Sequence, residues 1–241
     1  MRSRIYCALD THYLDQALEW ARDVRNAVDG LKLGLEFFNA HGTQGIRRVL
    51  SIAGPNTRLF LDLKFHDIPK TVYGAIHSVA ALQPEFMTVH ASGGVDMMRA
   101  AHQAAQDKAC ALGVQTAKIL AVTVLTHLDA DDLNQVGQGE NINDQVKRLA
   151  DLAMKAGLSG VVCSPQEVEM LRSHCGDEFT LMVPGIRPKG VDKADQKRVM
   201  SPEEAIAKGA SCLVVGRAIT GADNPGLAAL EIVNKMEQYA A

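Results

Sequence analysis

The sequence predicts an α/β fold, a closed (β/α)8 barrel of the TIM type formed as a single domain over residues 1–241. Short apolar runs rich in β-branched residues recur eight times, and segments with helical spacing of apolar residues lie between them. A length of 241 residues with 47% hydrophobic composition suffices for one large core, and no break in composition marks a linker. A doubly wound open sheet is the alternative, weakened because no Gly-x-Gly-x-x-Gly motif opens the first predicted helix.

Each predicted strand has the length and composition of a buried strand in a parallel sheet. In chain order the runs are RIYCALD (4–10), GLKLGLEF (30–37), LFLDLKF (59–65), EFMTVHA (85–91), KILAVTVLT (118–126), SGVVCS (159–164), TLMVPGI (180–186) and SCLVVGRAI (211–219). Helical spacing is clearest over residues 13–28, 143–157 and 226–240. Strict alternation of the two kinds of segment implies parallel βα units. The connection 126–143 is long enough to form a helical turn of its own.

The net charge of −3 and the isoelectric point near 6.2 give no general electrostatic reason to bind nucleic acid or an anionic membrane. An anionic ligand must therefore be held by a local site. The five cysteines show no Cys-x-x-Cys or His-Cys spacing, so we expect them to act as small buried hydrophobes rather than as metal ligands. The first residues turn polar quickly, which predicts neither a signal peptide nor a membrane span and favours the reducing cytoplasm.

In a barrel the chemistry belongs at the C-terminal ends of the strands. The polar residues at the predicted ends are Asp10, Lys32, Asp62 with Lys64, His90, Thr126, Ser164, Gly185 with Arg187, and Gly216 with Arg217. Any one of them alone is most simply a polar group that faces solvent. Charges from the first three strands that converge on one barrel mouth favour a shared site instead. His90 is interpreted as a core histidine rather than a ligand.

The third run carries two opposite charges inside an otherwise apolar strand. Asp62 and Lys64 are separated by one residue, so on an extended strand they point to the same face, about 7 Å apart along the chain. Leu59, Leu61 and Leu63 occupy the other face. The pair is compatible with the solvated side of an edge strand, with a buried pair that satisfies itself, and with a functional site.

The stretch LDLKFHDIPKTV (61–72) closely resembles the Asp-x-Lys-x-x-Asp-Ile-Pro-x-Thr motif of the orotidine 5′-phosphate decarboxylase family. The segments ALD (8–10), LKLGLEFF (31–38), VTVLT (122–126), VPGIRP (183–188) and VVGRAIT (214–220) follow the order found in that family. The resemblance implies a cytoplasmic homodimeric lyase of UMP biosynthesis that decarboxylates orotidine 5′-phosphate without a cofactor or a metal.

By this resemblance, Lys64 matches the catalytic lysine that delivers a proton to C6 of the pyrimidine, and Asp62 matches the carboxylate beside the departing CO2. Lys32 matches the second lysine of the charge network, which also approaches the ribose. Asp67 matches the acid that crosses into the neighbouring subunit's site, and Ile68 and Thr71 accompany it. His66, inside the motif, is interpreted as structural.

The resemblance also implies the remaining substrate contacts. Asp10 matches the ribose-binding carboxylate, and Thr126 and Pro184 match residues beside the nucleotide. The residues that bind the phosphate, and the loop that closes over it, are matched by Arg187, Gln196, Gly216 and Arg217. The polar segment 185–199, bounded by glycine and proline, is expected to form a mobile lid in which Gln196 covers the phosphate.

The implied reaction suits these residue types. Electrons left at C6 lie in the plane of the ring and cannot enter its π system, so stabilisation must be largely electrostatic. An ammonium group supplies the charge and then the proton. Two alternatives stay open: a metal-dependent sugar-phosphate decarboxylase or aldolase barrel that carries a similar Asp-x-Lys-x-x-Asp run, and a non-catalytic nucleotide-binding barrel. The first would favour an acidic residue at the end of the second strand, where this chain has Lys32. The second predicts that the charges of Lys32, Asp62, Lys64 and Asp67, or the phosphate site, are damaged.

Overall fold

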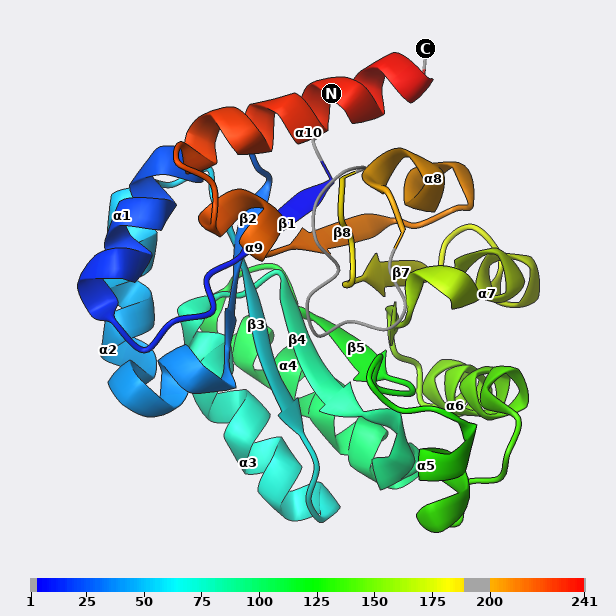
Figure 1. Cartoon of the computed structure of the whole chain (residues 1–241). Coiled ribbons are helices and arrows are strands. Elements are labelled where there is room, and N and C mark those ends of the chain that lie inside the picture. The colour runs from blue at the N-terminus through cyan, green and yellow to red at the C-terminus, as the bar shows by residue number, and fades with distance from the viewer. Residues whose placement is uncertain (1–3, 189–199, 241) are drawn as a thin grey trace.

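Eight parallel strands close into a barrel in sequence order, and β8 is hydrogen-bonded back to β1 (Figure 1). The computed structural model describes residues 4–188 and 200–240. The strands are β1 (Ile5–Ala8), β2 (Gly30–Gly34), β3 (Arg58–Phe65), β4 (Phe86–His90), β5 (Lys118–Val122), β6 (Gly160–Val162), β7 (Thr180–Val183) and β8 (Cys212–Val215). The predicted (β/α)8 barrel is confirmed, and the open sheet is not formed.

Helices surround the ring of strands on its outer side (Figure 1). The α-helices are α1 (Leu14–Val24), α2 (Leu35–Ala53), α3 (Pro69–Val79), α4 (Val95–Leu112), α5 (Ala130–Gln135), α6 (Ile142–Lys155), α7 (Val168–Cys175), α8 (Pro202–Ala207), α9 (Arg217–Thr220) and α10 (Pro225–Ala240), and the 3₁₀ turns are η1 (Ala80–Leu82), η2 (Ala91–Gly93) and η3 (Pro165–Glu167). Helix α5 is the helical turn predicted for the long connection after β5.

Most of the predicted strands are too long at their C-terminal ends, and three show it clearly. The second ends at Gly34 because α2 begins at the next residue, and the last ends at Val215 because Arg217 opens α9. The fifth ends at Val122 rather than at residue 126. An apolar run of this length does not distinguish a strand from the first turn of a buried helix, which explains the error.

The hydrophobic core has two parts that follow from side-chain alternation along the strands. Leu59, Leu61 and Leu63 of β3 point outward into the large cluster between the sheet and the helices, as the sequence predicted. Phe60 points inward into a smaller cluster inside the barrel, formed by Tyr6, Ala8, Phe60, Phe86, Leu120, Met182 and Val214. Asp62 follows Phe60 on the same inner face and therefore lies above this cluster.

An aromatic layer closes the barrel interior below the charged residues. Tyr6, Phe60 and Phe86 meet edge to face, with ring centroids 5.6 to 6.1 Å apart. Gly30 of β2 leaves the space that the Tyr6 ring fills, because a Cβ at this position would lie 2.5 Å from Tyr6 Cε1. The layer forms an apolar floor beneath the charged site.

The cysteines are all unpaired. Cys7 and Cys163 are buried, in agreement with the predicted role of small hydrophobes, and Cys175 and Cys212 are partly buried. Cys110 contradicts that prediction, since it lies exposed on α4, where the amphipathic helix turns toward solvent. In the described part of the chain, no helix combines the length and apolar character needed to cross a bilayer.

Candidate active site

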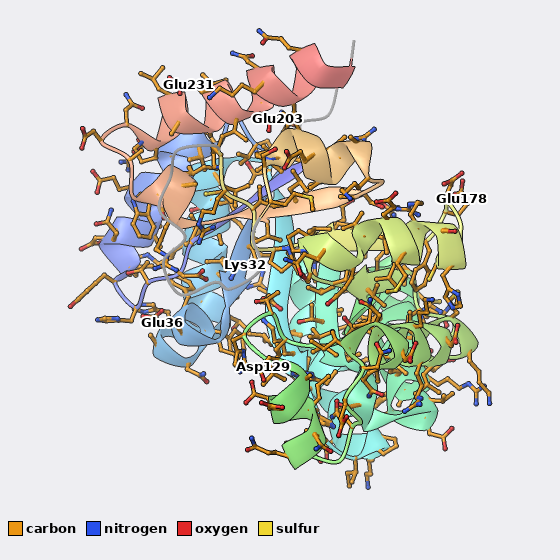
Figure 2. The ribbon with its side chains drawn as sticks, turned by 45° about the vertical axis from the view of Figure 1, so that its right-hand side comes forward. Lys32, Glu36, Asp129, Glu178, Glu203 and Glu231 are labelled. Atoms are coloured by element: carbon orange, nitrogen blue, oxygen red, sulfur yellow. The ribbon has the colours of Figure 1, made fainter. Side chains whose placement is uncertain are left out.

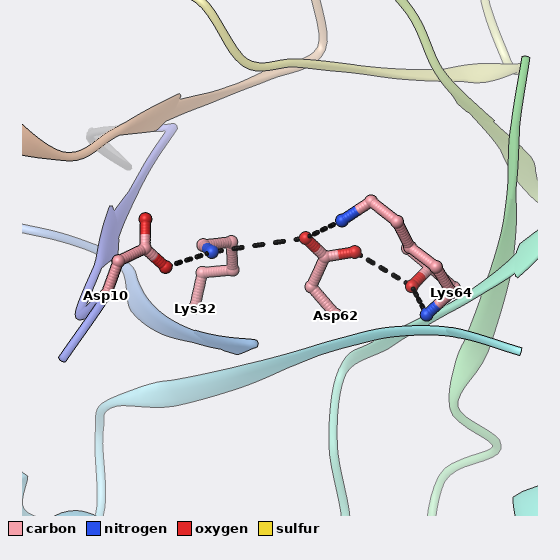
Figure 3. Close-up of polar contacts among 5 residues, drawn as sticks. Asp10, Lys32, Asp62 and Lys64 are labelled. Carbon is pink, nitrogen blue, oxygen red and sulfur yellow. Dashed lines mark hydrogen bonds and ion pairs between the residues drawn. The ribbon is translucent and has the colours of Figure 1, made fainter. Parts of the chain in front are cut away.

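Four charged side chains of alternating sign form a continuous row across the mouth of the barrel (Figure 3). Lys32 Nζ lies 2.6 Å from Asp10 Oδ1 and 4.0 Å from Asp62 Oδ2. The same Oδ2 of Asp62 accepts a hydrogen bond of 2.6 Å from Lys64 Nζ. The row sums to zero charge, which lowers the cost of holding four charges in one partly enclosed site.

Exposure to solvent falls toward the middle of the row. The Asp10 side chain is 60% exposed and that of Lys64 28%, whereas those of Lys32 and Asp62 are both 11% exposed. Burial alone lowers the pKa of Lys32, but the carboxylates of Asp10 and Asp62 outweigh it and raise this pKa. Burial alone raises the pKa of Asp62, but the ammonium groups of Lys64 and Lys32 outweigh it and lower this pKa. Both central groups are therefore held in their charged forms.

Lys64 occupies an unusual backbone conformation. Its φ is +47°, a left-handed value that a residue with a side chain adopts at a cost. The register of the β3–β4 ladder shifts at this point, so residues 62–64 lie opposite the single residue Thr88. The backbone N–H of Lys64 donates to Thr88 Oγ1 at 2.9 Å, and this hydroxyl donates to Asp62 Oδ1, also at 2.9 Å. The bulge therefore presents the lysine and the aspartate together.

A cavity of about 520 Å³ opens above the row at the C-terminal ends of the strands. Figure 2 shows Lys32 in the middle of the barrel, while Glu203 and Glu231 stand on the outer helices α8 and α10. The structure brings together in the cavity lining most of the residues that the sequence singled out: Asp10, Lys32, Asp62, Lys64, Thr126, Pro184, Arg187, Gly216 and Arg217. Phe60, Val122, Val162 and Val214 supply an apolar lower wall.

Three predicted site residues do not line this cavity. Asp67 and Ile68 lie between β3 and α3, Thr71 lies in the first turn of α3, and all three are exposed. Pro69 stands at the first turn of α3, where its missing N–H costs no helical hydrogen bond, and it keeps Ile68 extended. Asp67 Oδ1 accepts a 2.6 Å hydrogen bond from the N–H of Ile68. Gln196 and residues 189–199 of the predicted lid lie outside the described residues.

The sequence predicted Lys32 and Asp62 at the C-terminal ends of their strands, but both lie inside them. Lys32 is the third of five residues in β2, and Asp62 is followed by three more residues of β3. Both face the barrel interior one layer above the aromatic floor, because inward and outward positions alternate along a barrel strand. Their depth explains why they are more buried than Asp10.

Sequence reasoning missed Thr88 and Cys163. Thr88 is fully buried and stands on the inner face of β4 between Phe86 and His90, so strand periodicity alone could have placed it beside the charged pair. Cys163 is buried in the cavity wall, where burial raises the pKa of its thiol well above the ordinary value. The thiol is therefore a neutral part of the wall rather than a nucleophile.

His66 and His90 lie beside the row. Their ring centroids are 5.4 Å apart, and burial followed by the charges of His66 and Lys64 lowers the pKa of His90. His90 is partly buried, and its interpretation as a core histidine stays a prediction. Among the described residues, no group of three or more His, Cys, Asp or Glu side chains is arranged to hold a metal ion.

A larger hollow of about 860 Å³ lies at the opposite end of the barrel. Its charged lining includes Arg58 and Glu85, which pair with each other at 2.9 Å, and the hydroxyl of Tyr6 also hydrogen-bonds to Glu85. Arg58, Glu85 and Tyr6 therefore satisfy one another. Because barrel enzymes use the C-terminal end of the strands, the smaller cavity is the candidate active site.

Known proteins resemble this chain along nearly its whole length. The model of the orotidine 5′-phosphate decarboxylase / HUMPS family matches residues 3–232. A protein named orotidine 5′-phosphate decarboxylase from Rhodospirillum rubrum is 48% identical over 232 residues, which cover 96% of this chain and 93% of that protein. A protein of the same name from Thermobifida fusca is 46% identical over 241 residues, covering 100% and 99% of the two chains.

A solved structure supports the same relationship. The crystal structure of orotidine 5′-phosphate decarboxylase from Lactobacillus acidophilus superimposes with a TM-score of 0.84 at 34% sequence identity. The superposition covers 96% of this chain and 98% of that one. The likeness therefore extends over the whole barrel and is not confined to the short charged motif.

Proposed function

Because this chain belongs to the orotidine 5′-phosphate decarboxylase / HUMPS family, we propose that it is the decarboxylase that converts orotidine 5′-phosphate to uridine 5′-phosphate and CO2, a step of pyrimidine nucleotide synthesis. The observation that carries the proposal is the alternating row of Asp10, Lys32, Asp62 and Lys64 in the barrel mouth. The row combines a proton donor, fixed charge and an apolar floor in one cavity.

The reaction needs charge stabilisation more than covalent chemistry. When the C6–carboxylate bond breaks, its electron pair stays on C6 in the plane of the ring, so a nearby positive charge is the available stabiliser. Lys64 is the more exposed of the two lysines of the row, 28% against 11% for Lys32, and its Nζ lies 2.6 Å from Asp62 in the cavity lining. Its ammonium group stabilises the developing carbanion and then transfers a proton to C6. A guanidinium would supply the charge but hardly ever releases its proton.

Asp62 has two roles in this proposal. Its carboxylate, 2.6 Å from Lys64 Nζ, keeps the ammonium charged and directed toward the cavity. It also lies beside the substrate carboxylate, whose loss as neutral CO2 removes a like-charge contact. Lys32 balances the charge of Asp62 from the other side and, together with Asp10, faces the ribose hydroxyls.

The nucleotide lies across the cavity in the proposed complex. Thr126 and Pro184 contact the base side, and the substrate phosphate is held near Arg187, Gly216 and Arg217, beyond the ends of β7 and β8. Loops after the last two strands are a frequent phosphate site in barrels, and arginine can bind a phosphate with two parallel hydrogen bonds. Gln196 is proposed to cover the phosphate.

We further propose that two copies of the chain share their sites. The support is a continuous exposed stretch, residues 66–71, at the rim of the mouth, in which the apolar side chain of Ile68 is 65% exposed. In the dimer, Asp67 would extend the charged row from the partner subunit, with Ile68 and Thr71 packed beside it.

The test is the loss of absorbance of the orotate chromophore when the protein is mixed with orotidine 5′-phosphate in the presence of a chelator. We expect turnover in the wild type and, for Lys64→Ala, a loss of at least about 10³-fold, because both the charge and the proton donor are removed. Lys208→Ala, which removes a lysine on the outer surface after α8, is the matched control and should keep full activity.

Each other result points to a different protein. Neither turnover nor binding of orotidine 5′-phosphate would favour the metal-dependent sugar-phosphate barrels. Tight nucleotide binding without turnover would favour a binding protein that kept the site and lost the reaction. Full activity in Lys64→Ala would contradict the role of Lys64 while leaving the reaction itself in place.

A further inference from the structure

We propose that Thr88 is a positioning residue for decarboxylation, whose hydroxyl sets both the orientation of the Asp62 carboxylate and the backbone conformation from which Lys64 reaches the cavity. This inference rests on the function proposed above and adds a residue of β4 that lies outside the charged motif. Thr88 is not among the residues that line the cavity, so its effect on the reaction must pass through its two neighbours.

The Thr88 hydroxyl joins two groups that are distant in the sequence from β4. A threonine hydroxyl has one proton to donate and lone pairs to accept with. Its proton goes to Asp62 Oδ1 at 2.9 Å, and its oxygen accepts from the Lys64 N–H at 2.9 Å. Thr88 is 0% exposed, so water cannot take its place without rearrangement of the strands. In the described structure the hydroxyl therefore donates to one of these neighbours and accepts from the other.

The first bond orients the carboxylate. With Oδ1 held by Thr88, Oδ2 is turned toward the two ammonium groups, at 2.6 Å from Lys64 Nζ and 4.0 Å from Lys32 Nζ. A carboxylate without the hydroxyl could rotate about its terminal torsion, which is soft for aspartate. Rotation would alter the distances to both lysines at once.

The second bond supports the strained backbone of Lys64. Because residues 62–64 bulge out of register with β4, the N–H of Lys64 donates to a side-chain oxygen instead of to a strand carbonyl. This bond holds the residue at a φ of +47°, from which its side chain returns to the same carboxylate. Strained backbone of this kind persists where the surrounding contacts over-determine it.

The shape of Thr88 can be separated from its hydroxyl. Thr88→Val keeps the β-branched outline on the inner face above Phe86 and removes both hydrogen bonds, whereas Thr88→Ser keeps the hydroxyl and removes a methyl group. Thr123→Val is the matched control. Thr123 is also buried, directly after β5, and its hydroxyl donates to the carbonyl of Val162 without contact to the charged row.

The experiment is steady-state kinetics on the full chain with orotidine 5′-phosphate. For Thr88→Val we expect kcat to fall about 10²-fold with KM within about threefold of the wild type, because misplacement affects the reacting geometry more than nucleotide binding. Thr88→Ser should recover kcat to within about tenfold of the wild type. Thr123→Val should retain wild-type kcat even if its unfolding midpoint falls as much as that of Thr88→Val.

Amide hydrogen exchange at Lys64 gives a readout that does not depend on turnover. Exchange at this N–H should become at least about tenfold faster in Thr88→Val and stay slow in Thr88→Ser and Thr123→Val. Wild-type kcat in Thr88→Val, or equal losses in Thr88→Val and Thr123→Val, would overturn this inference and leave the proposed function intact. A wild type that does not turn over the substrate would instead overturn the proposed function, and with it the catalytic part of this inference.

Discussion

Replacement of Lys32 by methionine tests whether the charged row stabilises the ligand-free fold. Methionine keeps most of the length of the lysine stem and removes the ammonium, which is buried between Asp10 and Asp62. At 4.0 Å from Asp62 Oδ2, the attraction is about 4 kcal/mol for an effective dielectric constant of 20. The bond to the largely exposed Asp10 adds no more than about 1 kcal/mol, because solvent screens it.

The net effect is smaller than that sum. Burial of the ammonium costs free energy in the folded state, and removal of one partner from a buried ion pair typically destabilises a protein by 3–5 kcal/mol. Lys64 still neutralises Asp62 at 2.6 Å after the substitution. We therefore expect Lys32→Met to lower the free energy of unfolding by about 3 kcal/mol, the low end of that range.

The assay is urea unfolding at one fixed protein concentration, since an associating protein gains apparent stability from mass action. Because the folded-state pKa of Lys32 is raised, its contribution is fully present below the unfolded-state pKa of about 10.4 and is lost as pH rises through the folded-state pKa. The difference from wild type should therefore stay level between about pH 7 and 9.

Two further variants make the result interpretable. Lys208→Met removes an exposed lysine paired with Glu169, and it should leave the urea midpoint unchanged. In a double-mutant cycle, Lys32→Met and Asp62→Asn should be coupled by at least about 1 kcal/mol, because they share one contact. A midpoint for Lys32→Met at or above that of the wild type would refute the reasoning. It would mean that the burial cost exceeds the attraction, so that the row is kept for catalysis at the expense of stability.

The remaining predictions concern pH and space at the mouth. Burial, followed by the charges of His66 and Lys64, lowers the folded-state pKa of His90. Below about pH 6.5 the unfolded chain therefore binds more protons than the folded chain, and the wild type should lose stability relative to His90→Gln as pH falls from about 7.5 to 5.5. Equal slopes of the unfolding free energy against pH in the two proteins would contradict this. At Gly34 a Cβ would lie 3.3 Å from Lys32 Nζ. Gly34→Ala should therefore displace that ammonium and lower kcat/KM about tenfold, with little change in the unfolding midpoint. Wild-type kinetics in Gly34→Ala would show that activity does not depend on the observed position of the Lys32 ammonium.

Local patterns in the sequence predicted a large part of this protein. Eight apolar runs separated by helical segments implied the barrel, because alternation of strands and helices leaves a parallel sheet as the packing solution. The one-residue spacing of Asp62 and Lys64 predicted both side chains on one face of an extended strand. They do meet, at 2.6 Å, but through the bulge and the left-handed backbone at Lys64, which the strand period does not predict.

Tertiary structure decided the features that depend on strands paired across long intervals of sequence. The contact of Lys32 with Asp10 joins residues 22 positions apart, and that of Thr88 with Asp62 spans 26 positions. No local period reports the register between neighbouring strands, and the bulge at Lys64 changes that register within the site itself. The sequence by itself therefore determined which residue types face the barrel mouth. The closure and register of the barrel decided which of their atoms meet, because the distances between them are set by strand pairing and not by spacing along the chain.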